Sequence, residues 1–94
     1  MIYQDEVLEM IQNGIEAFEI INEVDKNFGK RFYSIDKNIK KLLNDIRKYF
    51  PDAEYYTASG GFNLLLGRPH SNYGDPQQEL VAFHGTSSIG DGDF

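Results

Sequence analysis

The spacing of apolar residues changes at Pro51, and this change constrains the fold more than any other feature of the sequence. Before Pro51, apolar residues recur every three or four positions, as one face of a helix requires. After it, short β-prone runs alternate with segments that contain glycine and proline. Because a proline also stops a helix from continuing, we expect a helical first half and a β-sheet in the second half.

The first half of the chain predicts two amphipathic helices. The first is expected over about residues 4–28, with the apolar stripe Val7, Ile11, Ile15, Phe18 and Ile21. Gly14 lies on this stripe, where we expect another backbone to pack closely, and Gly29 fits the left-handed position that ends a helix. The second helix is expected over about residues 35–50, with Ser34 as its N-cap. The short link 30–33 makes the two helices antiparallel neighbours.

The second half predicts three antiparallel strands, at about residues 54–58, 62–66 and 79–84. Gly60-Gly61 is a turn signal for the first hairpin. The segment 68–78 contains two prolines and a glycine, so we expect a surface loop, and the tail 85–94 is expected to fray. The predicted fold is a single α+β domain, residues 1–94, in which a two-helix antiparallel hairpin packs on a three-stranded antiparallel β-meander (ααβββ).

The chain of 94 residues contains no cysteine, which excludes disulfides, thiolate zinc sites and thiol catalysis. A domain of this size without disulfides fits a reducing compartment, so we expect a cytoplasmic protein. The acidic start of the chain is unlike the basic start of a signal peptide. No apolar run approaches the roughly 18 residues of a membrane span. We expect no membrane association, no cofactor and no metal site.

The net charge of −6 conceals a strong separation of acidic and basic residues along the chain. Residues 1–25 hold seven acids and no base, whereas residues 26–48 hold eight of the nine bases. Such a separation is informative about surfaces and partners rather than about the fold. It places an acidic row on the first predicted helix and a basic row on the second.

The acidic row lies opposite the apolar stripe of the first predicted helix. It consists of Glu9, Glu16, Glu19 and Glu23. Carboxylates in a row can imitate a phosphate backbone and occupy the nucleic-acid-binding surface of a partner protein. The alternative is a solvated face that keeps the helix soluble. A solvated face is the more frequent case, but the absence of any lysine from residues 1–25 is more than solubility requires and adds some weight to a binding role.

The basic row lies opposite the apolar stripe of the second predicted helix. It consists of Lys37, Lys40, Lys41, Arg47 and Lys48. One interpretation is a surface that binds phosphates or an acidic protein. The other is a solvated helix face. No aromatic residue interrupts the row to stack on bases, and the overall negative charge opposes nucleic acid, so the solvated face is the stronger interpretation.

The predicted loop gathers residues that are typical of a recognition loop. They are Arg68, His70, Asn72 and Tyr73. The alternative is an ordinary connection between strands. His70 and His84 are the two histidines of the chain, and with Asp75 they form a weak candidate for a small hydrolase or a metal site. Histidines without chemistry are the stronger interpretation.

These observations favour a small, acidic, non-catalytic protein–protein interaction module. The short, aromatic-rich, cysteine-free composition is typical of small proteins of phages and mobile elements, so one form of this hypothesis is an inhibitor of a host nucleic-acid-handling or defence enzyme. The wide apolar stripe of the first helix also predicts a homodimer. The alternatives are a nucleic-acid or nucleotide binder that uses the basic row, and a small histidine-dependent hydrolase.

Overall fold

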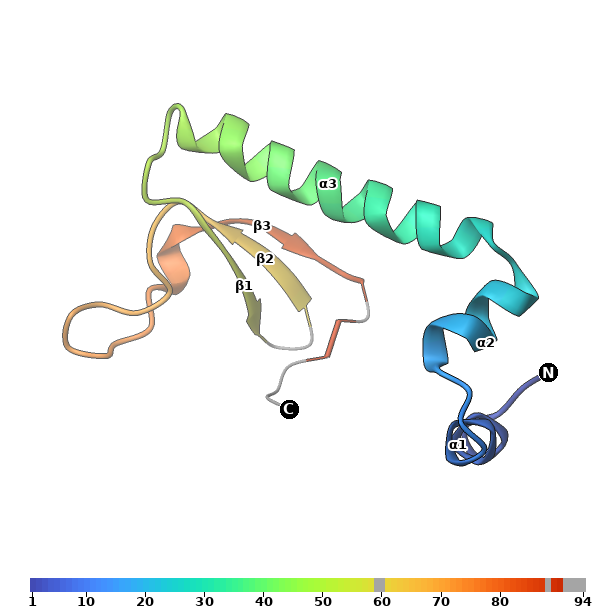
Figure 1. Ribbon diagram of the computed structural model, residues 1–94. Coiled ribbons are helices and arrows are strands. Elements are labelled where there is room, and N and C mark those ends of the chain that lie inside the picture. The colour runs from blue at the N-terminus through green and yellow to red at the C-terminus, as the bar shows by residue number, and fades with distance from the viewer. Residues whose placement is uncertain (59–60, 88, 91–94) are drawn as a thin grey trace. The chain divides into compact units, whose positions relative to one another are not determined.

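The computed structural model describes residues 1–58, 61–87 and 89–90 (Figure 1). Its elements are α1 (Gln4–Gln12), α2 (Ala17–Val24), α3 (Asn27–Arg47), β1 (Glu54–Ala58), β2 (Gly61–Leu65), the 3₁₀ helix η1 (Gln78–Leu80) and β3 (Val81–Gly85). The helices and the three-stranded antiparallel sheet confirm the predicted α+β class. Within the described ranges, no helix is long and apolar enough to cross a membrane.

Contacts between residues divide the chain into two compact units, Met1–Asn38 and Ile39–Phe94. We call them the N-terminal unit and the C-terminal unit. The first part of α3 belongs to the N-terminal unit and its last part, from Ile39, to the C-terminal unit. The expectation of a single domain stays a prediction.

The single helix predicted over residues 4–28 is wrong, because Gly14 ends α1. Gly14 has a φ of +93°, in the left-handed region. Its N–H donates to Ile11 O at 3.0 Å, and the N–H of Ile15 donates to Met10 O at 3.1 Å. This pair of bonds is the Schellman motif that closes a helix. A Cβ added to Gly14 would meet nothing within 4 Å, so the expected close packing of a backbone at this glycine is wrong too.

The second predicted helix begins earlier than expected, at Asn27. Asp25 has an extended backbone, and its Oδ1 accepts a hydrogen bond of 2.8 Å from the N–H of Asn27, as an N-cap does. Ser34, Gly29 and the predicted link 30–33 therefore lie inside α3. A glycine inside a helix costs only about 1 kcal/mol, which the cap and the long apolar stripe outweigh. The predicted hairpin with its turn at 30–33 is not confirmed.

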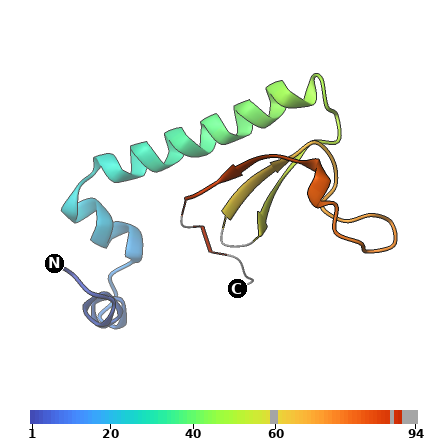
Figure 2. The same cartoon turned by 180° about the vertical axis from the view of Figure 1, so that it is seen from behind.

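The strand predictions agree closely with the sheet, whose order is β1–β2–β3 (Figure 1 and Figure 2). β1 has the predicted bounds, β2 begins one residue early at Gly61, and β3 begins at Val81 after η1. Gly61, assigned to the turn, is a strand residue that pairs with Ala58. Gly60 lies outside the described residues, as do residues 88 and 91–94 of the predicted tail.

Strand pairing separates the side chains of the C-terminal unit into two faces. Tyr55 pairs with Leu64, and Leu64 pairs with Phe83. The next row, Tyr56, Asn63 and His84, points to the opposite face because side chains alternate along a strand. The Tyr55 hydroxyl donates to Ile39 O of α3 at 2.7 Å, so the Tyr55 face is directed toward the part of α3 that belongs to the C-terminal unit.

The buried side chains lie next to and within this sheet. Ala53, Leu64 and Leu65 are the buried apolar residues of the described chain, and Asn63 is the buried polar one. Arg47, the last residue of α3, donates from Nε to Ala53 O at 2.8 Å and so fixes the connection to β1. In the N-terminal unit every residue is at least partly exposed. The core of the described residues therefore sits at the sheet, and two of its members, Asn63 and Leu65, also line a cavity.

Candidate functional site

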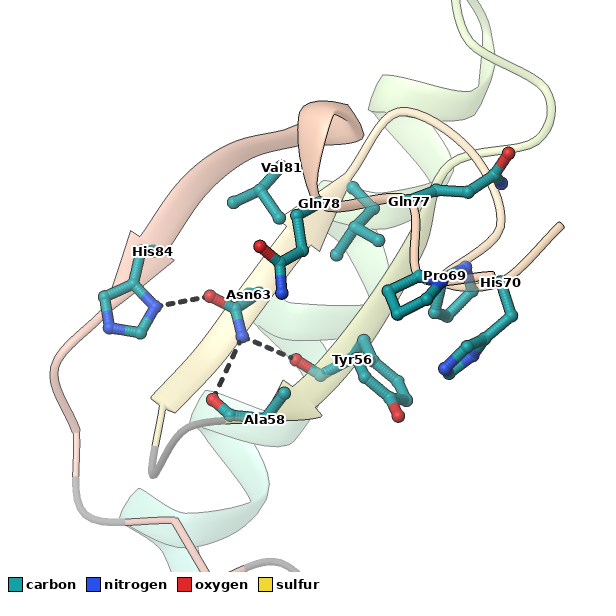
Figure 3. A pocket seen from close by; sticks show the side chains of 11 residues that line it. Tyr56, Ala58, Asn63, Pro69, His70, Gln77, Gln78, Val81 and His84 are labelled. Carbon is teal, nitrogen blue, oxygen red and sulfur yellow. Dashed lines mark hydrogen bonds between the residues drawn. The ribbon is translucent and has the colours of Figure 1, made fainter. Parts of the chain in front are cut away.

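A cavity of about 450 Å³ lies on the Asn63 face of the sheet (Figure 3). We call it the sheet cavity. Tyr56, Asn63, Leu65 and His84 line it from the strands, and Pro69, His70 and Pro76 line it from the loop. Ala58, Gln77, Gln78 and Val81 complete the lining. The floor is the run of alternate strand residues that pairing places on one face.

The loop wall of the cavity is a small hydrogen-bonded hairpin of its own. The N–H of Gln77 donates to Pro69 O at 2.8 Å, and His70 and Pro76 form an isolated β-bridge. At its tip, Ser71 Oγ accepts from the N–H groups of Tyr73 and Asp75, each at 3.2 Å. The predicted surface loop is therefore internally braced, which holds His70 at the cavity.

Asn63 is the centre of the polar contacts in the sheet cavity, and this residue is only 6% exposed. Its Nδ2 donates to Tyr56 O at 3.2 Å and to Ala58 O at 3.4 Å, as Figure 3 shows. Its Oδ1 forms a hydrogen bond with Nδ1 of His84. Because an amide oxygen only accepts, His84 Nδ1 carries the proton and donates, and Nε2 of the neutral ring keeps the lone pair.

Gly61 makes room for the His84 ring. A Cβ added to Gly61 would overlap His84 Cε1 and would lie 2.8 Å from Gly85 O, so a side chain at this position would push the ring away. Sequence reasoning assigned Gly61 to a turn and missed both this role and Asn63. A polar Asn between Phe62 and Leu64, in a strand of otherwise apolar residues, was the signal available for Asn63.

The opposite side of the cavity is aromatic. The rings of Tyr56 and His70 pack edge to face, with centroids 5.9 Å apart and an interplanar angle of 86°. The lining residues include no Asp, Glu, Lys or Arg. The two histidines therefore share one cavity, whereas Asp75, the third member of the predicted hydrolase set, does not line it. Within the described ranges, no group of three or more His, Asp or Glu residues could hold a metal.

A second cavity, of about 330 Å³, lies against the loop and contains all four predicted recognition residues. We call it the loop cavity. Its lining comprises Arg68, His70, Ser71, Asn72, Tyr73 and Gln77. His70 and Gln77 belong to both cavities, so the two adjoin. Arg68 Nη1 donates to Asn72 Oδ1 at 3.4 Å, a long hydrogen bond, and Tyr73 is 93% exposed.

The N-terminal unit carries an apolar groove of about 380 Å³ between the chain start, α1 and α2. We call it the helical groove. Its apolar lining is Ile2, Met10, Ile15, Ile20 and Val24. Two predicted acidic residues, Glu19 and Glu23 of α2, line it as well. The other two do not: Glu9 lies on α1, and Glu16 is the residue before α2. The prediction that all four share one helix face is wrong, because Gly14 ends the first helix between Glu9 and Glu16.

No protein-family model, curated protein or solved structure matches this chain. The chemistry of the two cavities and the groove therefore carries the functional argument.

The basic row lies along α3, and two of its members already make polar contacts within the chain. Lys37, Lys40, Lys41 and Arg47 belong to α3, and Lys48 follows it directly; all five are exposed. Arg47 is bonded to Ala53 O, and Lys48 Nζ pairs with Asp45 Oδ1 at 3.3 Å. A structural use of Arg47 weakens the interpretation of this row as a phosphate-binding surface.

Proposed function

We propose that this chain is a protein–protein interaction module whose helical groove binds a segment of a partner that combines apolar and basic side chains. One observation carries the proposal. Glu19 and Glu23 lie four residues apart on α2, hence one turn apart, and both line a groove that is otherwise apolar. Such a groove offers a hydrophobic floor with two negative charges beside it.

The exposure of the N-terminal unit supports a binding role. None of the residues 1–38 is buried, and large apolar side chains such as Phe18 and Val24 are 59% and 61% exposed. Contiguous exposed apolar surface in a soluble protein is typical of a surface that another molecule covers. The amphipathic character of α1 and α2 concentrates this surface on the helices rather than scattering it.

The groove also indicates the chemistry of the partner. Burial of an apolar side chain on the groove floor would supply most of the affinity, at roughly 25 cal/mol per Å² of area removed from water. Pairing of Lys or Arg with Glu19 and Glu23 would add little affinity at an exposed rim, but it would select the partner and speed the encounter. An amphipathic helix with basic residues along one edge fits both requirements.

The acidic surface used for binding is smaller than the sequence suggested. Two of the four predicted acidic residues, Glu19 and Glu23, carry the proposal, and a row of carboxylates that imitates a phosphate backbone is no longer required. Inhibition of a host enzyme, a cytoplasmic location and a second copy of the chain as the partner remain predictions.

A selection experiment tests the proposal and does not require the natural partner. A displayed library of random helical peptides is selected on the immobilised chain, and the enriched peptides are synthesised. We expect a consensus with apolar residues three or four positions apart and Lys or Arg beside them. The affinity of such a peptide should fall by about tenfold when Glu19→Lys and Glu23→Lys are combined, because each change removes a weak attraction and also adds a repulsion.

The matched control combines Glu6→Lys with Glu9→Lys, which changes the net charge equally on α1, outside the helical groove. This control should bind the peptide almost as wild type does. An enriched consensus without basic residues would contradict the proposal. An equal loss of affinity in both double variants would also contradict it, because only the overall charge would then matter.

A further inference from the structure

We infer that the sheet cavity and the loop cavity together form a binding site for a nucleoside monophosphate unit, either as a free nucleotide or within a nucleic-acid single strand. The base would occupy the sheet cavity and the phosphate the loop cavity. This site lies in the C-terminal unit and is independent of the helical groove, so either proposal can fail without the other.

The lining of the sheet cavity selects a neutral, planar group. A volume of about 450 Å³ is within the range of small-molecule sites. No carboxylate, ammonium or guanidinium group lines it. An ionic group that entered would lose water without gaining a charged partner, which is costly. The flat surfaces of Tyr56 and His70 and the two prolines, Pro69 and Pro76, instead suit an aromatic ring.

A polar side chain that lines the cavity could form hydrogen bonds with the edge of that ring. The side-chain amide of Gln78 projects into the sheet cavity (Figure 3). Gln78 is an exposed residue, and among the described residues its side-chain amide makes no hydrogen bond, so this amide offers both donors and an acceptor. Asn63, in contrast, is held by Tyr56 O, Ala58 O and His84, and serves as a rigid floor. A nucleobase presents the neutral edge, with donors and acceptors side by side, that an amide can match.

The loop cavity supplies the complementary cationic site. Arg68 is the sole basic residue of the sequence after Lys48. Among the described residues its guanidinium group donates one hydrogen bond, the long one of 3.4 Å to Asn72, so most of its guanidinium donors are available; its backbone oxygen accepts from Gln77 Nε2 at 2.7 Å. A guanidinium group binds phosphate oxygens in pairs. Asp75 and Glu79 are close in sequence but line neither cavity, so no carboxylate of the lining opposes an anion.

Because the two cavities adjoin, a single ligand could place a neutral planar ring in the sheet cavity and an anion in the loop cavity. His70 and Gln77 line both cavities, so the two adjoin and one ligand bound along the surface could contact both. The ligand must then carry a planar neutral ring and an anion on a short connection. A nucleoside monophosphate has this chemistry, with the ribose as the connection.

Calorimetric titration with the four common nucleoside monophosphates, the matching nucleosides and inorganic phosphate tests the inference. We expect at least one monophosphate to bind about tenfold more tightly than its nucleoside or phosphate alone. Arg68→Gln should lower the affinity of the monophosphate to that of the nucleoside and leave nucleoside binding unchanged. Gln78→Ala should weaken the nucleoside and the monophosphate by the same factor.

Lys41→Gln is the matched control, because it removes one positive charge from α3, away from both cavities. It should leave binding unchanged. Amide NMR spectra verify that each variant is folded, and shifts at Asn63 and Gln78 on titration locate the ligand. Tighter binding of a short single strand than of the free nucleotide would identify nucleic acid as the source of the ligand, and the reverse would identify a free nucleotide.

Three results would overturn the inference. One is the absence of saturable binding by any of the four monophosphates. Another is binding of inorganic phosphate as tightly as a monophosphate, which would leave the sheet cavity without a role. The third is an equal loss of affinity in Arg68→Gln and Lys41→Gln, which would indicate attraction by overall charge only.

Discussion

The hydroxyl of Tyr55 donates a hydrogen bond of 2.7 Å to the carbonyl oxygen of Ile39. Tyr55 lies in β1, and Ile39 lies in the part of α3 that belongs to the C-terminal unit. The next residue in the strand, Tyr56, points to the other face and lines the sheet cavity. Because side chains alternate along β1, Tyr55 contacts α3 and Tyr56 lines the sheet cavity.

Removal of the Tyr55 hydroxyl should destabilise the C-terminal unit. Tyr55→Phe keeps the ring and its contact with Phe62, with centroids 4.7 Å apart, but removes the hydrogen bond to Ile39. We expect the free energy of unfolding to fall by about 0.5–1.5 kcal/mol, measured by urea denaturation followed by circular dichroism. Tyr49→Phe is the control, because Tyr49 is 81% exposed, and its effect should be negligible. Equal effects of the two changes would show that the bond contributes nothing.

The same hydroxyl should make stability depend on alkaline pH. Burial raises the pKa of Tyr55, and a hydrogen bond with the backbone of Leu43 lowers it in part, so the net shift is upward. The folded state then holds the proton more tightly than the unfolded state, whose tyrosine pKa is about 10. The stabilisation is fully present below that pH and is lost as pH rises through the folded-state pKa. Urea denaturation at increasing pH should show a steeper alkaline decline in wild type than in Tyr55→Phe, and parallel declines would contradict this assignment.

The sheet could be predicted from the sequence because its signals are local. Short β-prone runs bounded by glycine and proline placed β1 at its observed residues and β2 and β3 within one or two residues. The helix boundaries could not be predicted in the same way, because Ile11 and Ile15 keep a helical spacing across the break at Gly14. A periodic pattern does not report whether a glycine adopts a positive φ.

The candidate site was predicted only in part, for a related reason. Arg68 and His70 were identified because polar and basic residues in a loop are conspicuous in a sequence. Asn63, Gly61 and Gln78 were missed, because their roles depend on which strands are neighbours and on their register. Asn63 contacts β1 through Ala58 O and β3 through His84, and no local pattern contains that information.

Asp25 should stabilise α3 as its N-cap. Asp25→Ala removes the acceptor of the 2.8 Å bond from the N–H of Asn27, and we expect a loss of about 1 kcal/mol of helix stability. Thermal melting followed by the helical circular dichroism signal measures it. Asp25→Asn is the control, because an asparagine caps a helix about as well as an aspartate. An equal loss in the Asn variant would mean that charge, and not capping, is responsible.

Two glycines of the helical region should respond to alanine with opposite signs. At Gly14 the φ of +93° makes any side chain strained, so Gly14→Ala should destabilise by about 1–2 kcal/mol although the space around it is empty. Gly29 lies inside α3, where an added Cβ would meet its nearest neighbour, Asn22 Oδ1, at an ordinary 3.9 Å. Gly29→Ala should therefore stabilise by about 0.5–1 kcal/mol. The same sign for both variants in thermal melting would contradict the assignment of Gly14 as the helix terminator.

The hydrogen bond from His84 to Asn63 should fix the tautomer of the imidazole ring. Asn63 Nδ2 is committed to two carbonyl oxygens, so its Oδ1 faces the ring and requires a proton on Nδ1. Nitrogen NMR spectra, recorded at a pH where the ring is neutral, should show His84 protonated at Nδ1, with Nε2 unprotonated.

Gly61→Ala should abolish this preference, because the added Cβ would occupy the position of His84 Cε1. Gly85→Ala is not a suitable comparison, since its Cβ would lie 2.8 Å from Phe62 O. Gly29→Ala, far from the sheet in sequence and free of strain, should leave the spectrum unchanged. An Nε2-protonated ring in wild type would refute the orientation of Asn63 on which the rigid floor of the sheet cavity depends.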